Sequence, residues 1–502
     1  MKRSITEFLK ETLFNFSDKT AYQDEIRKVT FAEVDKFSGK IGCSLVKRNV
    51  FCKPILVLME RNALTPTCHI GIARSGNYYI PMDTTNPIIR LQQIIDIVES
   101  KILIVDKKSL TILDNLKFDG EILIFEQLLT ENFEKELLEP IEQKISSHFP
   151  LYIIFTSGST GKPKGVTTSH EALINYLESV IEILSINDND ILGNQSPMDY
   201  IAAVRDIYIP LMTGATTQII PSKEFSIPNA LLDRLNNTQI TTICWSAAGL
   251  ELCVNTGLFE CGIPKYIKKI LFSGSVLSAT ALMAWQKALP NAVFVNQYGP
   301  TEATASCTYH VVREIANENT VLPIGIPYKN YKIIILDTEG KEIINNEIGE
   351  ICVSGPSISL GYYNNLEATQ KSFIQNPTNK FYREILYKTG DLGRLNNNGE
   401  YEYCGRIDRQ FKIMGHRIEP EEIEQCGKNI KDVNECVCIY DKSKSLIYFV
   451  YSGDAVTRDI SLTFRKKLPS YMIPRKIIQI EKIPKLPNGK INIKQIEKEI
   501  LK

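Results

Sequence analysis

Short apolar runs rich in β-branched residues alternate with amphipathic stretches through most of this chain. Pro54–Met59, Lys101–Asp106 and Glu121–Phe125 have the length and composition of buried strands. Thr65–Arg74, which begins with Thr-Pro, is typical of a helix. Strands that alternate with helices predict βαβ units and largely parallel sheets. We therefore expect an α/β protein over the larger, N-terminal part of the chain.

The pattern changes at about residue 324, where strand-like runs follow one another more closely. Turn signals such as Asn396–Gly399 separate them. The runs are Tyr331–Asp337, Gly349–Ser354 and Gly399–Cys404. This spacing predicts a β-rich unit, a barrel or a meander. After residue 405 a small α+β unit is expected, with strands at Cys436–Tyr440 and Leu446–Tyr451.

Composition excludes several classes of function. The 502 residues include 58 Lys+Arg and 58 Asp+Glu, interleaved along the chain, which argues against a nucleic-acid partner. No stretch approaches the ~20 apolar residues of a membrane span, and the N-terminus lacks the apolar region of a signal peptide. The 12 cysteines are scattered and form no CxxC pair. We therefore expect reduced cysteines in a cytoplasmic protein without a membrane partner.

The segment Leu151–Val166 contains the most informative loop. An apolar strand leads directly into Thr156–Gly161, which consists of small hydroxyl and glycine residues. Glycine lets backbone N–H groups turn toward an anion, and Lys162 and Lys164 add positive charge. The spacing differs from a Walker A loop, because Pro163 follows Lys162. A flexible surface loop is the alternative, but two lysines around a proline directly after a buried strand favour nucleotide phosphates.

Seven segments resemble, in the same order, the motifs of the adenylate-forming superfamily of acyl-CoA synthetases, luciferases and peptide-synthetase adenylation domains. They are Arg74–Asp83, Tyr152–Val166, Asn296–Glu302, Gly349–Gly355 with Gly361–Tyr362, Tyr387–Leu392, Gly405–Glu419 and Leu486–Ile491. The likeness spans roughly residues 30 to 500. The motif versions are most similar to those of amino-acid-activating adenylation domains.

The resemblance implies a multi-domain α/β fold. Its body, residues 1–404, would hold ATP and the acyl substrate in two βα subdomains and a β-barrel-like subdomain. A hinge at residues 405–410 would join the body to a small, mobile α+β lid of residues 411–502. Asp408 has the position at which one residue absorbs the change of backbone angles.

The implied reaction forms an acyl adenylate: a carboxylate oxygen attacks the α-phosphate of ATP, and pyrophosphate leaves. Catalysis then rests on alignment and on stabilising charge on the phosphate oxygens. Thr301 would offer its hydroxyl to the α-phosphate, and Glu302 would bind Mg²⁺. Lys164 would hold the β- and γ-phosphates. With Lys490, these residues form the predicted catalytic set.

The predicted ATP-binding residues come from the loop and from later motifs. Tyr298 would stack on adenine, Asp391 would accept hydrogen bonds from two ribose hydroxyls, and Arg406 would support Asp391 from the other side of the nucleotide. Without the resemblance, Thr301-Glu302 would be a helix start and Asp391 a turn residue. The set is Thr156, Ser157, Gly158, Ser159, Thr160, Gly161, Asn296, Tyr298, Gly299, Asp391 and Arg406.

Lys490 lies in a Pro-Asn-Gly-Lys turn near the C-terminus. Its cation would reach the substrate carboxylate and the α-phosphate and reduce the repulsion between them. By itself, a lysine in a turn is usually a solvated surface residue. In similar enzymes the lid swings between two arrangements, so Lys490 would serve the first half-reaction. Phe411–Gly415 would then replace it and line a tunnel for a thiol.

The acyl pocket is expected around Pro197–Asp206. Amino-acid-activating relatives usually carry Phe-Asp here, and alignment on Thr213–Ala215 places Tyr200-Ile201 at that dipeptide. The carboxylate that would pair with a substrate ammonium is missing unless Asp199 takes its place, and a buried ammonium without an anion is strongly disfavoured. The substrate then lacks an α-amine or places its amine differently, as in a β-amino acid.

The other predicted pocket residues are mostly small or apolar. They are Ala202, Arg205, Ala248, Leu271, Ser273, Gln297, Ala305 and Ser306. Arg205 is the exception, and three alternatives stay open for it: pairing with a substrate acid, pairing with Asp206, or facing solvent.

We expect a ligase that uses ATP and Mg²⁺ to activate an amino acid or small carboxylic acid. It would transfer the acyl group to the phosphopantetheine thiol of a carrier protein, as in nonribosomal peptide-type biosynthesis. Because the chain ends about a dozen residues after Lys490, the carrier is expected to be a separate protein. The alternatives are an acyl- or aryl-CoA ligase that uses free CoA, and a D-alanine–carrier protein ligase. A catalytically silent binding protein is a further alternative, which the intact motifs disfavour.

Overall fold

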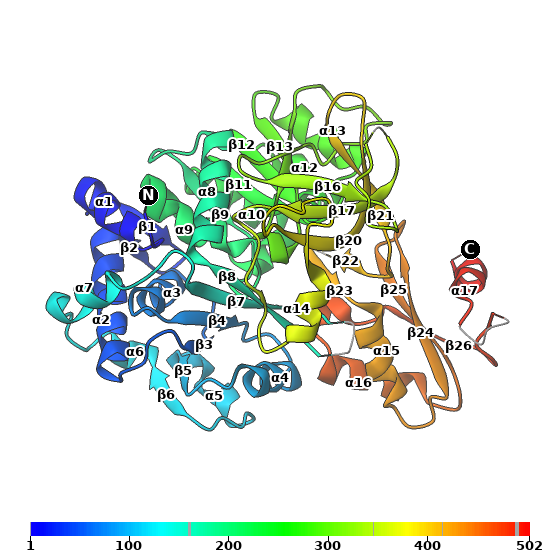
Figure 1. Cartoon of the computed structure of the whole chain (residues 1–502), viewed down its shortest axis with the longest axis horizontal. Helices are drawn as coiled ribbons and strands as arrows, with labels where there is room; N and C mark the ends of the chain where they lie inside the picture. Colours follow the sequence, from blue (N-terminus) through cyan, green and yellow to red (C-terminus); the bar gives the residue numbers. More distant parts are fainter. Residues whose placement is uncertain (1, 159–161, 345, 414, 487–490, 502) are drawn as a thin grey trace.

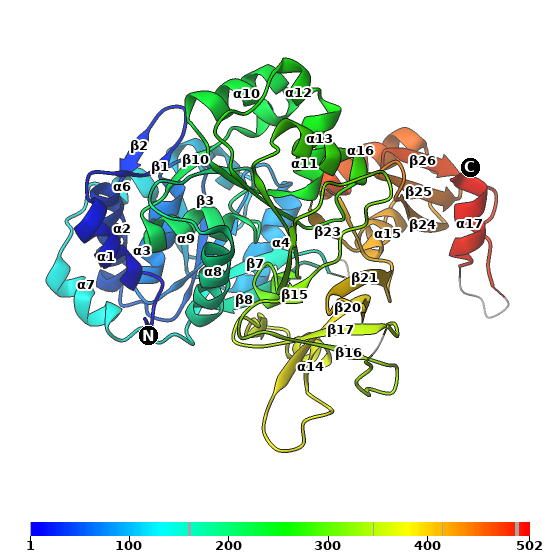
Figure 2. The same cartoon turned by 90° about the horizontal axis from the view of Figure 1, so that it is seen from above.

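The structure, a computed structural model, describes residues 2–158, 162–344, 346–413, 415–486 and 491–501. Most of the chain forms a large body, and the C-terminal part forms a smaller unit at one side of it (Figure 1). The N-terminus lies on the side of the body away from the smaller unit, as Figures 1 and 2 both show. Among the described residues, no helix has the length and apolar character needed to cross a membrane.

Seven strands form the first large sheet: β3 (Pro54–Leu58), β4 (Tyr78–Met82), β5 (Ile102–Val105), β6 (Glu121–Ile124), β7 (Pro150–Thr156), β8 (Lys164–Ser169) and β18 (Gly361–Tyr362). Their order is β18-β8-β7-β4-β3-β5-β6. β3 to β7 pair in parallel, as predicted, whereas β8 and β18 are antiparallel additions at one edge. β3 and β4 are buried along their whole length, as expected for strands covered on both faces.

The helical segments that accompany this sheet lie just before β3 or between β3 and β7 along the chain. They are α2 (Phe31–Lys47), α3 (Thr65–Arg74), α4 (Ile88–Val98), η1 (Lys107–Ser109), α5 (Leu110–Leu113), α6 (Phe125–Leu128) and α7 (Lys135–Glu142). α2 begins with a capping box, in which Thr30 and Glu33 each accept a backbone N–H of the other. α3 has the predicted bounds and carries Pro66 in its first turn.

Nine strands form the second large sheet: β1 (Thr20–Gln23), β2 (Lys28–Thr30), β9 (Ile191–Asn194), β10 (Thr216–Ile219), β11 (Thr242–Ser246), β12 (Lys269–Ser273), β13 (Val293–Tyr298), β14 (Thr308–Val312) and β15 (Ile326–Pro327). Their order is β15-β14-β13-β12-β11-β9-β10-β1-β2. The strands from β13 to β1 in this order pair in parallel, and antiparallel strands complete both edges.

The helical segments of this second half of the body include both buried and surface elements. They are α1 (Glu7–Phe16), α8 (His170–Leu184), α9 (Ala203–Thr213), η2 (Ser222–Ser226), α10 (Pro228–Asn237), α11 (Ala247–Asn255), α12 (Leu258–Cys261), α13 (Ala279–Ala288) and η3 (Thr301–Ala303). One apolar core reaches across both large sheets, and a second core around Trp245 and Trp285 fills the other face of the nine-stranded sheet.

The β-rich part is a five-stranded antiparallel sheet of β16 (Lys332–Leu336), β17 (Gly349–Ser354), β19 (Phe373–Gln375), β20 (Ile385–Leu395) and β21 (Tyr401–Arg406), with α14 (Leu366–Ser372) beside it. It begins at Lys332, later than the expected residue 324, because β15 belongs to the nine-stranded sheet. β21 continues to Arg406, which pairs with Asp391 of β20. The boundary between body and hinge stays a prediction.

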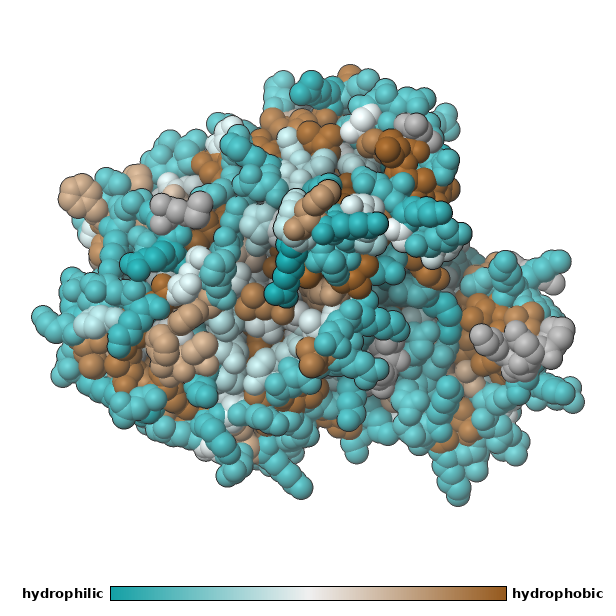
Figure 3. Space-filling model, viewed as in Figure 1, coloured by the Kyte–Doolittle hydropathy of each residue, from teal (hydrophilic) through white to brown (hydrophobic). Residues whose placement is uncertain are grey.

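The C-terminal unit contains the hairpin β22 (Phe411–Ile413) and β23 (His416–Ile418), and the three-stranded sheet β24 (Glu435–Asp441), β25 (Leu446–Ser452) and β26 (Lys476–Gln479). Its helical segments are α15 (Pro420–Lys428), α16 (Thr457–Lys467), η4 (Ser470–Met472) and α17 (Ile493–Ile500). α17 lies at the end of the unit that is remote from the body (Figures 1 and 2). The exposed face in Figure 3 is mostly hydrophilic, with its apolar surface in separate patches.

The C-terminal unit packs on the body through a buried ion pair. Arg90 in α4 and Glu422 in α15 lie 3.0 Å apart, with side chains 5% and 6% exposed. α16 also contacts α4. Two buried charges are stable only while they remain paired, so this contact favours the docked position of the unit.

We expect Arg90→Met to loosen the C-terminal unit, because the substitution keeps an unbranched, flexible side chain but leaves Glu422 buried without a cation. Removing one partner of a buried pair costs about 3–5 kcal/mol. Small-angle X-ray scattering should give a larger radius of gyration for this variant. Arg394→Met is the matched control, since the Arg394–Glu402 pair has side chains 42% and 31% exposed. Identical scattering curves for Arg90→Met and the parent protein would contradict this role.

Candidate active site

A cavity lies between the body and the β22–β23 hairpin, and both contribute to its lining. The body supplies the end of β7, the segment that enters α9, the ends of β12 and β13, and parts of β20 and β21. Eleven of the residues predicted from the sequence line this one cavity: Thr156, Ser157, Ile201, Ala202, Arg205, Ser273, Gly299, Thr301, Ala305, Asp391 and Arg406. Predicted nucleotide-binding and acyl-binding residues thus meet in one place.

Asp391 is held from two sides. The Tyr298 hydroxyl donates a hydrogen bond to its Oδ2 atom, and the Arg406 guanidinium donates to its Oδ1 atom. Arg406 also forms an ion pair with Asp408. Burial raises the pKa of Asp408, but its hydrogen bond and ion pair with Arg406 lower it further, to a value below its ordinary one. Tyr298 is outside the cavity lining, so its stacking on adenine stays a prediction, as does the hinge role of Asp408.

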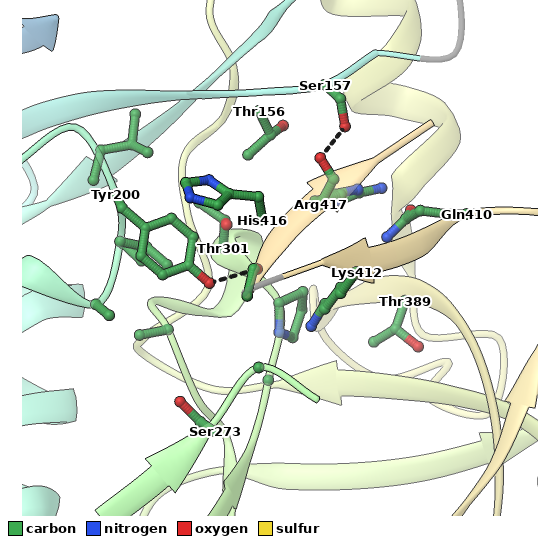
Figure 4. Close-up of a pocket in the computed structure, with 18 of the residues that line it drawn as sticks. Thr156, Ser157, Tyr200, Ser273, Thr301, Thr389, Gln410, Lys412, His416 and Arg417 are labelled. Atoms are coloured by element: carbon green, nitrogen blue, oxygen red, sulfur yellow. Dashed lines mark hydrogen bonds between the residues drawn. The ribbon is translucent and has the colours of Figure 1, made fainter. Parts of the chain in front are cut away.

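The two ends of the predicted phosphate loop are fixed by β7 and β8, in which Thr156 pairs with Lys164. The Ser157 hydroxyl donates a hydrogen bond of 2.7 Å to the carbonyl oxygen of Arg417 (Figure 4). Burial and the nearby Arg417 lower the pKa of Lys164. Lys164 and Gly158 are outside the cavity lining. Ser159, Thr160 and Gly161, like Lys490, lie outside the described residues.

Glu302 is completely buried beside the cavity. Its Oε1 atom accepts hydrogen bonds from the Tyr362 hydroxyl at 2.6 Å and from Arg417 Nη1 at 2.8 Å. Its Oε2 atom has no hydrogen-bond partner among the described residues. Burial raises the pKa of Glu302, but Arg417 and Tyr362 outweigh that effect, so the pKa lies below its ordinary value. The carboxylate predicted to bind Mg²⁺ is therefore paired here with an arginine from the C-terminal unit.

The hairpin closes one side of the cavity through its turn. The Tyr200 hydroxyl donates a hydrogen bond of 2.8 Å to the carbonyl oxygen of Gly415 (Figure 4). The His416 and Tyr471 rings stack with centroids 3.9 Å apart. Burial lowers the pKa of His416 to about 4, so the ring is neutral near pH 7. Lys412 also lines the cavity, and burial lowers its pKa. Lys412 and Gly415 thus bring the predicted segment Phe411–Gly415 to the site.

Several predicted residues lie outside the lining. Asn296 donates its side-chain amide to the carbonyl oxygen of Pro323 at 2.8 Å, which is a contact within the body. Leu271 is part of the main apolar core. The predicted residues outside the lining are Gly158, Lys164, Asp199, Ala248, Leu271, Asn296, Gln297, Tyr298, Glu302 and Ser306.

Asp199 does not place its carboxylate in the cavity lining. It accepts a hydrogen bond from the Asn86 side chain at 3.1 Å. Burial and the neighbouring Asp83 raise the pKa of Asp199 to about 7. At the aligned position, Ile201 lines the cavity with an apolar side chain.

Arg205 lines the cavity from α9 and is 1% exposed, which excludes a solvent-facing side chain. Asp206 turns its Oδ2 atom toward Asn194 Nδ2 at 2.7 Å. Among the described residues, no carboxylate oxygen lies within 4.0 Å of the Arg205 guanidinium. Arg406, by contrast, forms an ion pair with Asp408.

Comparison with known proteins identifies the family. Residues 9–363 match the family described as AMP-binding enzyme. The chain belongs to this family. The predicted relationship to adenylate-forming enzymes is therefore confirmed.

Curated relatives align along nearly the whole chain. D-alanine--D-alanyl carrier protein ligase of Bacillus cereus is 29% identical over 510 residues, which cover 99% of each protein. Bacitracin synthase 1 of Bacillus licheniformis is 28% identical over 98% of this chain. Surfactin synthase subunit 1 of Bacillus subtilis is 29% identical, also over 98%. The chain spans only 9% and 14% of the length of these two synthases.

Solved structures share the fold. The Vibrio cholerae adenylation domain AlmE, in complex with glycyl-adenosine-5'-phosphate, has a TM-score of 0.85 at 20% identity and covers 100% of this chain and 98% of its own. NpsA-ThdA from Klebsiella oxytoca, an artificially fused adenylation-PCP di-domain, has a TM-score of 0.80 at 19% identity and covers 95% and 93%. The predicted multi-domain α/β fold is confirmed.

Several other lining residues received no role from the sequence, among them six with polar or aromatic side chains: Tyr200, Thr389, Gln410, His416, Arg417 and Tyr471. Thr389 lies in the motif segment Tyr387–Leu392, and Gln410, His416 and Arg417 lie in Gly405–Glu419. Their position in a motif could have identified these four residues. Tyr471 lies outside the seven segments that carry the resemblance. Its place in the site depends on its stacking with His416.

Arg417→Met should destabilise the protein more at pH 7 than at pH 4. In the parent protein the lowered pKa of Glu302 adds stability above the unfolded-state pKa of about 4.3, and this stability is lost as the pH falls through the folded-state value. Without Arg417, burial raises the pKa of Glu302, so the charged form opposes folding near neutrality. The loss at pH 7 should be about 3–5 kcal/mol.

Thermal unfolding of both proteins at pH 7 and pH 4 tests this expectation. Arg383→Met, at an exposed arginine, is the control for loss of one positive charge. Equal losses of stability for Arg417→Met at the two pH values would show that Arg417 does not stabilise the Glu302 carboxylate.

Proposed function

We propose that this chain uses ATP to convert a small carboxylic acid into its acyl adenylate. In this reaction a carboxylate oxygen bonds to the α-phosphorus, and the bond from that phosphorus to the pyrophosphate oxygen breaks. The observation that carries the proposal is the shared cavity, in which Thr156, Thr301 and Asp391 lie together with Ile201 and Ala202. Residues predicted to bind phosphate and ribose, next to residues predicted to bind the acyl group, suit a reaction that joins a nucleotide to an acid.

The roles of the chain's own residues follow from chemistry and position. Thr156, Ser157 and Thr301 would donate hydroxyl hydrogen bonds to phosphate oxygens, on which negative charge accumulates. Asp391, held by Tyr298 and Arg406, would accept hydrogen bonds from the ribose hydroxyls. A carboxylate fixed in this way loses little entropy on binding, so it orients the nucleotide efficiently.

Glu302 is the residue that would hold Mg²⁺. The ion usually binds through one or two carboxylates together with substrate phosphates. The buried Oε2 atom of Glu302, which has no hydrogen-bond partner among the described residues, fits that role. Bound Mg²⁺ would supply positive charge to the phosphate oxygens. In the present arrangement Arg417 supplies positive charge to the same carboxylate.

The second step that we propose is transfer of the acyl group to the thiol of a phosphopantetheine on a carrier protein, with AMP as the leaving group. The relatives support this acceptor, since one is a D-alanyl carrier protein ligase and NpsA-ThdA joins an adenylation domain to a PCP. Lys412 and Gly415 in the lining suit this step, in which the hairpin segment is predicted to replace Lys490. A cytoplasmic location remains part of the proposal.

Exchange of labelled pyrophosphate into ATP tests the first step. With a suitable acid, the parent protein should catalyse acid-dependent exchange, and Lys490→Ala should reduce it at least ~100-fold by removing positive charge next to the reacting groups. Lys490→Ala should still transfer the acyl group from a chemically prepared acyl adenylate, because Lys490 serves only the first step. Lys482→Ala, an exposed lysine in the same segment, is the control.

Two outcomes would contradict the proposal. Folded parent protein that shows no exchange with any member of a panel of amino, β-amino, hydroxy, aryl and dicarboxylic acids would exclude adenylate formation. Unchanged exchange in Lys490→Ala would exclude the role of that residue. Transfer to free CoA but not to a phosphopantetheinylated carrier protein would make the chain a CoA ligase.

Gly415→Val should impair the second step selectively. Gly415 has φ +86°, and an added Cβ atom would lie 3.2 Å from the Tyr200 hydroxyl oxygen. A β-branched residue is strained at this backbone angle and crowds Tyr200, so the hairpin should dock less well. Acyl transfer should fall at least tenfold while pyrophosphate exchange changes less than about twofold. Equal losses in both assays would show that the docked hairpin is not specific to transfer.

A further inference from the structure

Arg205 is a fully buried cation whose hydrogen-bond partners among the described residues are all neutral. Its Nη1 atom lies 3.4 Å from the Tyr176 hydroxyl and 3.4 Å from Gln297 Oε1, and its Nη2 atom lies 3.2 Å from the carbonyl oxygen of Cys244. Its Nε atom is buried and has no hydrogen-bond partner among the described residues. These bonds are long for a guanidinium, which normally forms short, charge-assisted pairs with carboxylates.

The neighbouring acid does not neutralise Arg205. Asp206 is oriented toward Asn194, and burial raises its pKa to about 7, against the opposing effect of Asn194 and Arg205. Asp206 is therefore only partly ionised near neutral pH. A buried cation without a paired anion costs several kcal/mol of folding free energy. When such a cation lines a binding cavity, an anionic ligand can supply the missing negative charge.

Other polar atoms around Arg205 are also without partners. Gln297 Nε2 and the Tyr328 hydroxyl are buried and lack hydrogen-bond partners among the described residues. Gln297 contacts Arg205 directly, and the Tyr328 ring lies 6.2 Å from that of Tyr176. Arg205 Nε and Gln297 Nε2 are thus buried donors without partners among the described residues. Unsatisfied donors at a guanidinium suit a carboxylate, which accepts several hydrogen bonds.

The rest of the cavity does not suit an ammonium group. Asp391 is the one carboxylate among the described lining residues; it pairs with Arg406, and the proposed function assigns it to the ribose hydroxyls. Ile201 presents a hydrocarbon where amino-acid-activating relatives carry an aspartate, and Asp199 is outside the lining. A substrate ammonium would find no unpaired carboxylate among the described lining residues and would be repelled by Arg205.

We infer that the acid activated by this chain is a small dicarboxylic acid without an α-amino group, whose second carboxylate binds Arg205 while the first is adenylated. The inference rests on the proposed adenylate-forming function and specifies its substrate class. Gln297 and Tyr328 are outside the cavity lining, so the proposal assigns the second carboxylate to Arg205. Ile201 and Ala202 would contact the carbon chain between the two carboxylates.

Matched acids test this inference in the parent protein. The panel contains dicarboxylic acids of four to six carbons, their half-amides, the monocarboxylic acids of equal length, and the corresponding α-amino dicarboxylic acids. Acid-dependent pyrophosphate exchange gives kcat/KM for each. A hydrogen bond to a charged group contributes about 1.5–3 kcal/mol, so the best dicarboxylic acid should exceed its half-amide and its α-amino analogue at least tenfold.

Variants at position 205 assign the preference to the arginine. In Arg205→Met the ratio of kcat/KM for the dicarboxylic acid to that for the monocarboxylic acid should fall at least tenfold, and Arg205→Lys should restore part of it. Arg383→Met, at an exposed arginine, should keep the parent ratio. Circular dichroism verifies that each variant is folded. The comparison of acids in the parent protein decides the question even where Arg205→Met does not fold.

The possible failures are distinguishable. If no acid supports exchange with folded parent protein, the proposed function fails together with the inference. If amino acids or monocarboxylic acids match or exceed the dicarboxylic acids, the function stands and the inference is wrong. If folded Arg205→Met retains the parent preference for dicarboxylic acids, Arg205 does not bind the second carboxylate, and its assignment is overturned.

Discussion

The ion pair between Arg417 and Glu302 joins the C-terminal unit to the body beside the cavity. Glu302 is completely buried in the body, and its charge needs a nearby cation. Because Arg417 comes from β23 of the C-terminal unit, docking of that unit also compensates a charge inside the body. The same hairpin brings Gly415 to Tyr200 and closes the cavity. Electrostatic compensation in the body and closure of the cavity are therefore coupled.

The zero net charge of the chain is compatible with phosphate chemistry because the relevant charges are local. Arg406, Lys412 and Arg417 all line the same cavity, and Lys164 lies near Arg417 and Glu302. In a region of low dielectric constant, a few cations at short range act more strongly on a phosphate than a diffuse surface charge does. A general basic excess, of the kind that nucleic-acid binders need, is thus unnecessary here.

The elements that sequence predicts well are those determined by local pattern. α3 has the expected bounds, β17 covers Gly349–Ser354 as expected, and the parallel strands follow from buried β-branched runs. The motif residues Thr301 and Asp391 reach one cavity although they are far apart in the chain. Contacts made by tertiary packing were not predictable. The Asn296 side chain donates a hydrogen bond to the carbonyl oxygen of Pro323, and the Tyr471 ring stacks on His416. No local sequence pattern indicates either contact.

The acyl pocket that we propose would differ from that of an amino-acid-activating enzyme by two changes with the same electrostatic direction. On the predicted alignment, Ile201 replaces a negative charge and Arg205 adds a positive one, and both residues line one cavity. Either change alone would leave a cation unpaired, on the ligand or on the protein, whereas a second carboxylate on the ligand satisfies both. Such an acid brings extra negative charge toward ATP, which would slow attack on the α-phosphate. Anchoring the second carboxylate at a buried arginine counters that repulsion, because its charge is neutralised inside the pocket.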